Sequence, residues 1–148
     1  NNNVGIVQTS DNVVILNEMV HDHRVIPLDP RPRLGEAIRL WMGSSQARWD
    51  GDTLVVSTTN FRPMVFRSAS EKFTLTEKFT LVDADTLMYE FTVNDPTTWT
   101  RPWTGMIPLK LKNELIYEYA CHEANEAIPG MLRGHRYEEN QTAKTGSK

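Results

Sequence analysis

A series of short runs rich in β-branched and aromatic residues, each bounded by turn residues, constrains this chain more than any other feature. Apolar and polar residues alternate along most of the runs, which is the pattern of strands that bury one face. Asp50-Gly51, Lys112-Asn113 and the segment VDADT supply the chemistry of hairpin turns. The runs cover residues 4–9, 12–20, 23–29, 53–59, 72–82, 86–93, 104–111 and 114–123. The sequence therefore predicts an all-β antiparallel meander.

The number of strands also predicts whether the sheet stays open or closes into a barrel. About eight strands joined by tight turns favour a sheet that closes on itself, because open edges promote aggregation. We expect a lipocalin-like barrel rather than a sandwich, since neighbouring strands are joined by hairpins and not by long crossings. A closed barrel of about eight strands can hold one small ligand.

Two segments depart from the strand pattern and predict helical structure. One stripe at helical spacing, which Gly43 can end, consists of Leu34, Ile38, Trp41 and Met42. The residues after the last run favour a short helical turn followed by a polar tail. We therefore expect a barrel domain over residues 1–137 and a tail over residues 138–148.

Composition and charge exclude several classes of function. The chain has 148 residues, of which 39% are apolar and 24% charged, as in a single globular domain. Its net charge of -3, with no concentrated basic face, argues against nucleic-acid binding. No apolar run reaches the roughly 20 residues of a membrane span. The single cysteine excludes an internal disulfide, and the oligomeric state stays open.

Two glutamates stand on faces that are otherwise apolar. Glu77 alternates with Phe73, Leu75 and Phe79, and Glu18 shares its face with neighbouring valines and a leucine. A carboxylate on a core face must be paired or hydrogen-bonded, and burial tends to raise its pKa towards that of a general acid or base. The alternatives are contact with a ligand and a structural ion pair of Glu77 with Arg24 or Arg101.

The segment Cys121-His122-Glu123 contains residue types that bind metals and act in covalent catalysis. On a continuous strand, however, Cys121 and His122 point to opposite faces, so the three make a poor metal site. A buried structural cysteine is the simpler interpretation. Glu118 shares a face with His122, which keeps His122 a candidate acid.

The segment MVHDHR forms a second polar cluster. His21 and His23 lie two residues apart and could join His122 in a three-histidine metal site. The spacing is not characteristic of a metal site, and such a pair on a turn is more often solvated. We therefore expect no metal. The chain also lacks a glycine-rich phosphate loop, a GxSxG elbow and an HExxH motif, so we expect no cofactor.

The loop DPTTWTRPW concentrates aromatic residues around an arginine. Trp99 and Trp103 at a barrel mouth could stack on a sugar or another flat ligand, and Arg101 could offer a cation–π or carboxylate contact. The alternative is a hydrophobic lid that closes the end of the barrel.

Four segments together resemble the C-terminal half of a large family of uncharacterised exported bacterial proteins. They are EMVHDHRVIPLD, LWMGSSQARWDGDTLVVSTTNF, EKFTLVDADTLMYEFTVNDPTTWTRPW and IYEYACHEAN. The resemblance covers most of residues 1–137 and implies export, hence a periplasmic or secreted location. The chain does not begin with methionine, and we expect it to be a fragment or processed form. The family often has a small residue in place of His23 and glycine in place of Pro30, and it carries no activity to transfer.

Three functions are consistent with these patterns. The first is binding of a small organic or carbohydrate ligand, with candidate ligand-binding residues Trp99, Trp103, Arg101, Arg24, Tyr117 and His21. The second is a lyase, isomerase or hydrolase, with candidate catalytic residues Glu77 and Glu18 as base and His122 and Tyr119 as acid. The third is an assembly role through exposed strand edges.

Overall fold

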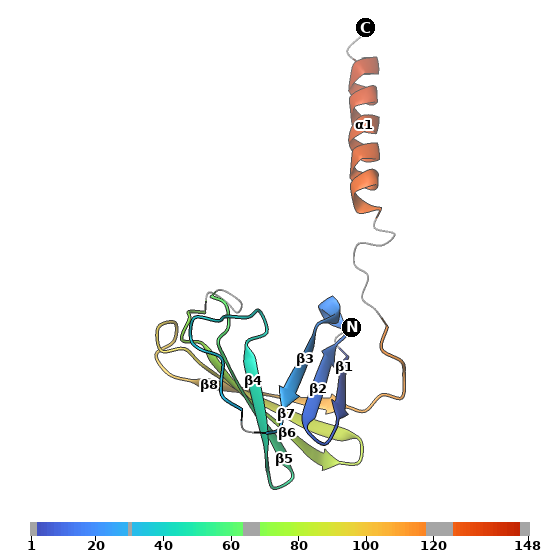
Figure 1. The fold of residues 1–148 in the computed structure, drawn as a ribbon. Helices are drawn as coiled ribbons and strands as arrows, with labels where there is room; N and C mark the ends of the chain where they lie inside the picture. The colour runs from blue at the N-terminus through green and yellow to red at the C-terminus, as the bar shows by residue number, and fades with distance from the viewer. Residues whose placement is uncertain (1–2, 30, 64–68, 118–125, 146–148) are drawn as a thin grey trace. The chain divides into compact units, whose positions relative to one another are not determined.

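The computed structural model (Figure 1) divides the chain into two compact units, Asn1–Tyr117 and Glu118–Lys148. Each unit is described by itself. The structure describes residues 3–29, 31–63, 69–117 and 126–145.

The first unit contains two antiparallel sheets in which every strand pairs with its neighbour in sequence. The three-stranded sheet consists of β1 (Val4–Gln8), β2 (Asn12–Asn17) and β3 (His23–Pro27), with a short 3-10 turn, η1 (Met19–His21), between the last two. The five-stranded sheet consists of β4 (Ser44–Asp50), β5 (Thr53–Thr59), β6 (Thr74–Asp83), β7 (Thr86–Asn94) and β8 (Trp103–Lys110). The predicted all-β antiparallel class is therefore confirmed, but the strands form two sheets, each a meander of its own.

Closure into a lipocalin-like barrel is not confirmed. In the described part of the chain the meander is interrupted between β3 and β4, where residues 31–43 form turns and one isolated bridge instead of a hairpin. The hairpin expected around Lys112-Asn113 is also not formed, since residues 111–117 have no strand structure. Consequently β1 and β8 are outer strands of their sheets (Figure 1).

One face of each sheet is buried against the other. Alternate residues of β2, Val13 and Ile15, point inward, as do Leu54 and Val56 of β5. This follows from the period of two in the strands, which places every second side chain on the same face. Burying each such side chain contributes about 1.5–3 kcal/mol. The core that joins the sheets comprises Val13, Ile15, Ile26, Ala47, Leu54, Val56 and Phe79.

The prediction of a short helix around Leu34 and Ile38 is wrong, because residues 31–43 contain no helix. The side-chain amide of Asn60 donates hydrogen bonds to the backbone carbonyls of Leu34, Gly35 and Ile38, at 3.0 to 3.2 Å. These carbonyls are the acceptors that a helix would need. The Leu40 backbone amide in turn donates to the carbonyl of Asn60. A side chain distant in sequence therefore takes the backbone partners of the amphipathic segment.

Gly43 has a different role from the predicted helix end. Its φ of +67° is in the left-handed region, and a Cβ there would come within 2.6 Å of the Thr58 side chain. Only glycine fits both requirements, because it has no Cβ and tolerates positive φ. Gly43 thus allows the chain to enter β4 directly against β5.

The second unit contains the helix α1 (Ala127–Thr145), which is longer than the helical turn predicted from the sequence. It includes residues 138–145, where a polar tail was expected, so the predicted boundary after residue 137 falls inside it. Glutamates, alanine and lysine in this stretch are good helix formers, and the His135–Glu139 pair has helical spacing at 3.3 Å. None of the described helices meets the length and apolarity that a transmembrane span requires.

Candidate functional site

Glu77, the first predicted catalytic residue, is buried and fully engaged by two partners. Its carboxylate accepts hydrogen bonds from both terminal nitrogens of Arg24, at 2.7 and 2.8 Å, in a bidentate ion pair. The Tyr89 hydroxyl donates a third hydrogen bond to the same group, at 2.9 Å. Glu77 is only 2% exposed. Of the alternatives that the sequence left open, the structure shows the ion pair with Arg24.

The three residues come from both sheets. Arg24 lies on β3, whereas Glu77 and Tyr89 lie on β6 and β7 of the five-stranded sheet. The ion pair therefore joins the two sheets through their buried faces. Bidentate arginine–carboxylate pairs are among the strongest and most directional polar contacts in proteins. We call Arg24, Glu77 and Tyr89 the inter-sheet triad.

The electrostatics of the inter-sheet triad keep each group in one protonation state. Burial lowers the pKa of Arg24, but its hydrogen bond to Glu77 and the attraction of that carboxylate outweigh this effect, so the net pKa is raised. Burial, and then the nearby negative charge of Glu77, raise the pKa of the Tyr89 hydroxyl well above its ordinary value. The arginine stays charged and the tyrosine stays a donor, which suits a structural contact.

Glu18 and the two histidines of the MVHDHR segment lie at or next to the β2–β3 turn. Glu18 is 7% exposed, and its carboxylate accepts a hydrogen bond from the Asn3 backbone amide at 3.1 Å. No hydrogen bond among the described residues joins Glu18 to Glu77. His21 and His23 are exposed, and the φ of +47° at His21 puts it in the left-handed region.

The predicted aromatic residues of the 95–103 loop belong to a second core. Trp99 and Trp103 pack edge to face with centroids 6.2 Å apart, and Trp103 contacts Phe91 at 5.7 Å. Both tryptophans pack on the cluster of Phe61, Ala69, Phe73 and Val93. Arg101 is exposed. The two interpretations were a ligand-stacking site and a hydrophobic lid. This packing favours the lid, because the rings cover apolar side chains of the sheet.

Asp95, which the sequence analysis did not single out, holds this aromatic loop in place. Its carboxylate accepts hydrogen bonds from the backbone amide and hydroxyl of Ser70, and from Thr97 and Thr98. Burial opposes ionisation, but the hydrogen bonds from Thr97, Ser70 and Thr98 outweigh it and hold the pKa of Asp95 far below its ordinary value. The sequence signal for this turn is Asp95-Pro96 followed by two threonines.

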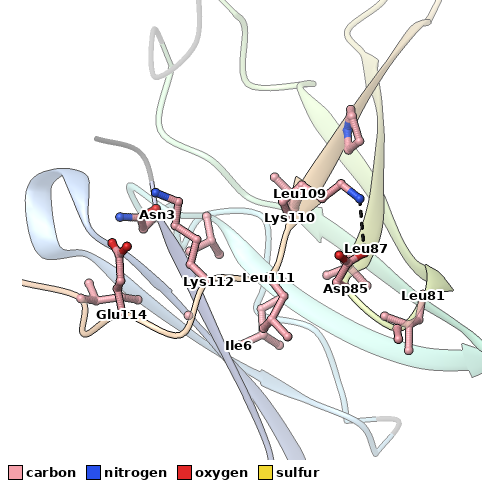
Figure 2. A pocket seen from close by; sticks show the side chains of 15 residues that line it. Asn3, Ile6, Leu81, Asp85, Leu87, Leu109, Lys110, Leu111, Lys112 and Glu114 are labelled. Atoms are coloured by element: carbon pink, nitrogen blue, oxygen red, sulfur yellow. Dashed lines mark hydrogen bonds and ion pairs between the residues drawn. The ribbon is translucent and has the colours of Figure 1, made fainter.

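A pocket lies elsewhere in the described part of the chain, where β1 and β8, the outer strands of the two sheets, face residues 111–116. Its volume is about 600 Å³. Figure 2 shows Ile6 of β1, Leu81 and Leu87 near the β6–β7 turn, and Leu109 of β8 around one hollow. We call it the edge pocket, defined by Asn3, Val4, Gly5, Ile6, Leu81, Ala84, Asp85, Leu87, Pro108, Leu109, Lys110, Leu111, Lys112, Glu114 and Ile116.

The wall formed by residues 111–116 fits onto β1 through a glycine. A Cβ at Gly5 would lie 3.1 Å from Cδ1 of Ile116, closer than ordinary van der Waals contact. The missing side chain lets Ile116 approach the backbone of β1. The chain that follows β8 thereby becomes one side of the edge pocket.

A smaller hollow of about 130 Å³ adjoins the edge pocket, and we call it the inner pocket. Ile6, Leu81 and Leu87 line both pockets. The inner pocket leads toward the core that joins the sheets and adds Gln8, Val13, Trp49, Asp52, Leu54 and Phe79.

Of the predicted site residues that the structure describes, none lines either pocket. Tyr117 is exposed and directly follows Ile116 of the pocket wall. Tyr119, His122 and the neighbouring Cys121 and Glu123 lie outside the described residues. Within the described ranges no group of three or more histidine, cysteine, aspartate or glutamate residues could hold a metal ion.

Comparisons with family models, with curated proteins and with solved structures found no match to the chain.

Proposed function

We propose that the protein binds a small, largely apolar molecule in the edge pocket. The observation that carries this proposal is the pocket itself, whose volume of about 600 Å³ and mostly aliphatic lining suit a small ligand. Ligand sites in proteins are typically clefts of about 300–1,000 Å³, apolar with a few polar groups. Here Asn3, Asp85, Lys110, Lys112 and Glu114 supply the polar groups.

The geometry of Glu77 favours binding over catalysis. A general base must have a free lone pair within reach of its substrate. The carboxylate of Glu77 already accepts three hydrogen bonds, from Arg24 and Tyr89, and it lines neither pocket. We therefore assign the inter-sheet triad to the stability of the fold and the edge pocket to the function. Export and a closed lipocalin-like barrel stay predictions.

The proposal is tested with N-phenylnaphthylamine, an uncharged apolar fluorophore whose emission rises in an apolar site. We expect saturable binding to the protein and its loss in Ile6→Trp, because the larger ring fills the wall that the two pockets share. Val7→Trp is the matched control, since Val7 is the next residue of β1, is 61% exposed and lines neither pocket.

Equal binding by the two variants would place the fluorophore elsewhere and contradict the proposal. Absence of binding to the unaltered protein would contradict it as well. Circular dichroism of both variants checks that each retains the sheet structure.

A further inference from the structure

The edge pocket is lined by aliphatic side chains without a single aromatic one among its fifteen described residues. Flat ligands such as sugars and aromatic rings are generally held by stacking on aromatic faces. Leucine and isoleucine side chains instead make many weak, non-directional contacts, which suit flexible hydrocarbon. The lining therefore points to an aliphatic ligand.

The shape of the site favours a ligand with an extended hydrocarbon chain over a compact ligand. The edge pocket of about 600 Å³ and the inner pocket of about 130 Å³ share Ile6, Leu81 and Leu87, and the inner pocket also has Trp49 and Phe79 in its lining. An extended hydrocarbon tail can occupy the wide part and continue past these three side chains. A compact aliphatic body would fill only the wide part.

The lining carries two lysines and two carboxylates, and one of these lysines is available to a ligand with one negative charge. Lys110 already has an anionic partner, because its ammonium group lies 3.3 Å from the Asp85 carboxylate (Figure 2). The same ammonium group also contacts the Thr86 hydroxyl. Lys112 forms no ion pair within the described residues, and it lines the same pocket as the side-chain amide of Asn3. Glu114 lines the pocket as well and disfavours a head group with two negative charges.

We propose that the ligand is a free fatty acid, a single aliphatic chain with one carboxylate. Its carboxylate pairs with Lys112 at the rim, and its tail lies along Ile6, Leu81 and Leu87 towards the inner pocket. This inference rests on the proposed function of the edge pocket and adds the class of ligand to it.

The test is displacement of N-phenylnaphthylamine by octanoate, decanoate and dodecanoate, each below its micelle concentration. Each added methylene group should lower the Kd about fourfold, which corresponds to about 0.8 kcal/mol per buried methylene. Dodecanoate should bind more tightly than dodecanol, and dodecylamine should bind least.

Lys112→Gln should remove the advantage of dodecanoate over dodecanol and leave dodecanol binding unchanged. Lys72→Gln is the control, because Lys72 is exposed and lies just before β6, at the opposite end of that strand from the turn that lines the pocket. The control should keep the full preference for the carboxylate.

Distinct results separate the inference from the proposed function. A Kd that does not depend on chain length, or tighter binding of dodecylamine than of dodecanoate, would overturn the fatty-acid assignment. If the fluorophore binds and is lost in Ile6→Trp, but no fatty acid displaces it, the binding function stands and the ligand class is wrong. If the fluorophore does not bind at all, both fail.

Discussion

The two sheets of the first unit meet in two regions that differ in how the space between them is used. Around Ile15, Ile26 and Val56 the space is filled, and the inter-sheet triad adds a bidentate ion pair with a third hydrogen bond from Tyr89. Around Ile6 and Leu109 the space is not filled and forms the edge pocket. We refer to these as the filled region and the open region.

The comparison shows in which region charged side chains are accessible to a ligand. In the filled region Glu77 is buried and Arg24 largely so, and the two charges pair with each other, since an unpaired buried charge would be strongly unfavourable. The Nε of Arg24 is buried as well and has no hydrogen-bond partner among the described residues. In the open region Lys112 and Glu114 sit beside exposed aliphatic surface and stay accessible. In this protein the buried carboxylate therefore stabilises the fold, and the leucines of the edge pocket indicate where a ligand can bind.

The largest expected effect comes from breaking the ion pair of the filled region. Glu77→Gln should lower the free energy of unfolding by about 3–5 kcal/mol, because it leaves the Arg24 charge buried without its partner. Glu90→Gln makes the same chemical change in a more exposed pair with Lys78, at 2.9 Å, and should lose at most about 1 kcal/mol. Urea unfolding of both variants measures the difference. Similar losses would show that the triad does not hold the sheets together.

Two isoleucines of the three-stranded sheet compare the regions directly. Ile26 is 0% exposed in the filled region, whereas Ile6 is 38% exposed at the open one. Ile26→Ala should lower the free energy of unfolding by about 2–5 kcal/mol, and Ile6→Ala by about 1 kcal/mol or less. Fluorophore affinity should follow the reverse order, with the larger loss in Ile6→Ala. Thermal unfolding measures the loss of stability, and fluorescence titration measures the fluorophore affinity. If the variant with the larger loss of stability also lost more affinity, the distinction between the filled and open regions would be refuted.

A smaller effect tests the hydroxyl of the inter-sheet triad. Tyr89→Phe removes the hydrogen bond to Glu77, whose other bonds remain, so we expect a loss of about 1–3 kcal/mol at neutral pH. Because the pKa of Tyr89 is raised in the folded state, its contribution is complete below about pH 10 and is lost as the pH rises further. The unfolding free energy of Tyr89→Phe should therefore fall less steeply above about pH 10. Identical slopes for the two proteins would contradict the triad.

The sequence predicted most of the sheet because strand pairing here is local. The run at 53–59 and the hairpin around VDADT match β5 and the β6–β7 turn, since alternation and turn residues lie within the segments themselves. The helix expected at Leu34 and Ile38 failed because its competitor, Asn60, lies more than twenty residues away. A local pattern cannot reveal a distant hydrogen-bond donor.

The site was predictable only in part, for the same reason. Alternation identified Glu77 as a buried carboxylate, but Arg24 and Arg101 were equal candidates as its partner until the sheets were placed together. The edge pocket could not be predicted, because its walls come from β1, the β6–β7 turn, β8 and residues 111–116. None of these segments has a distinctive motif.

The most direct test of the account is methyl NMR of the protein during titration with N-phenylnaphthylamine. We predict shifts of the Leu81, Leu87 and Leu109 methyl signals, which line the edge pocket, while Val56 of the filled region stays in place. Shifts confined to the filled region, or to the aromatic cluster around Trp99, would contradict the assignment of the open region to ligand binding.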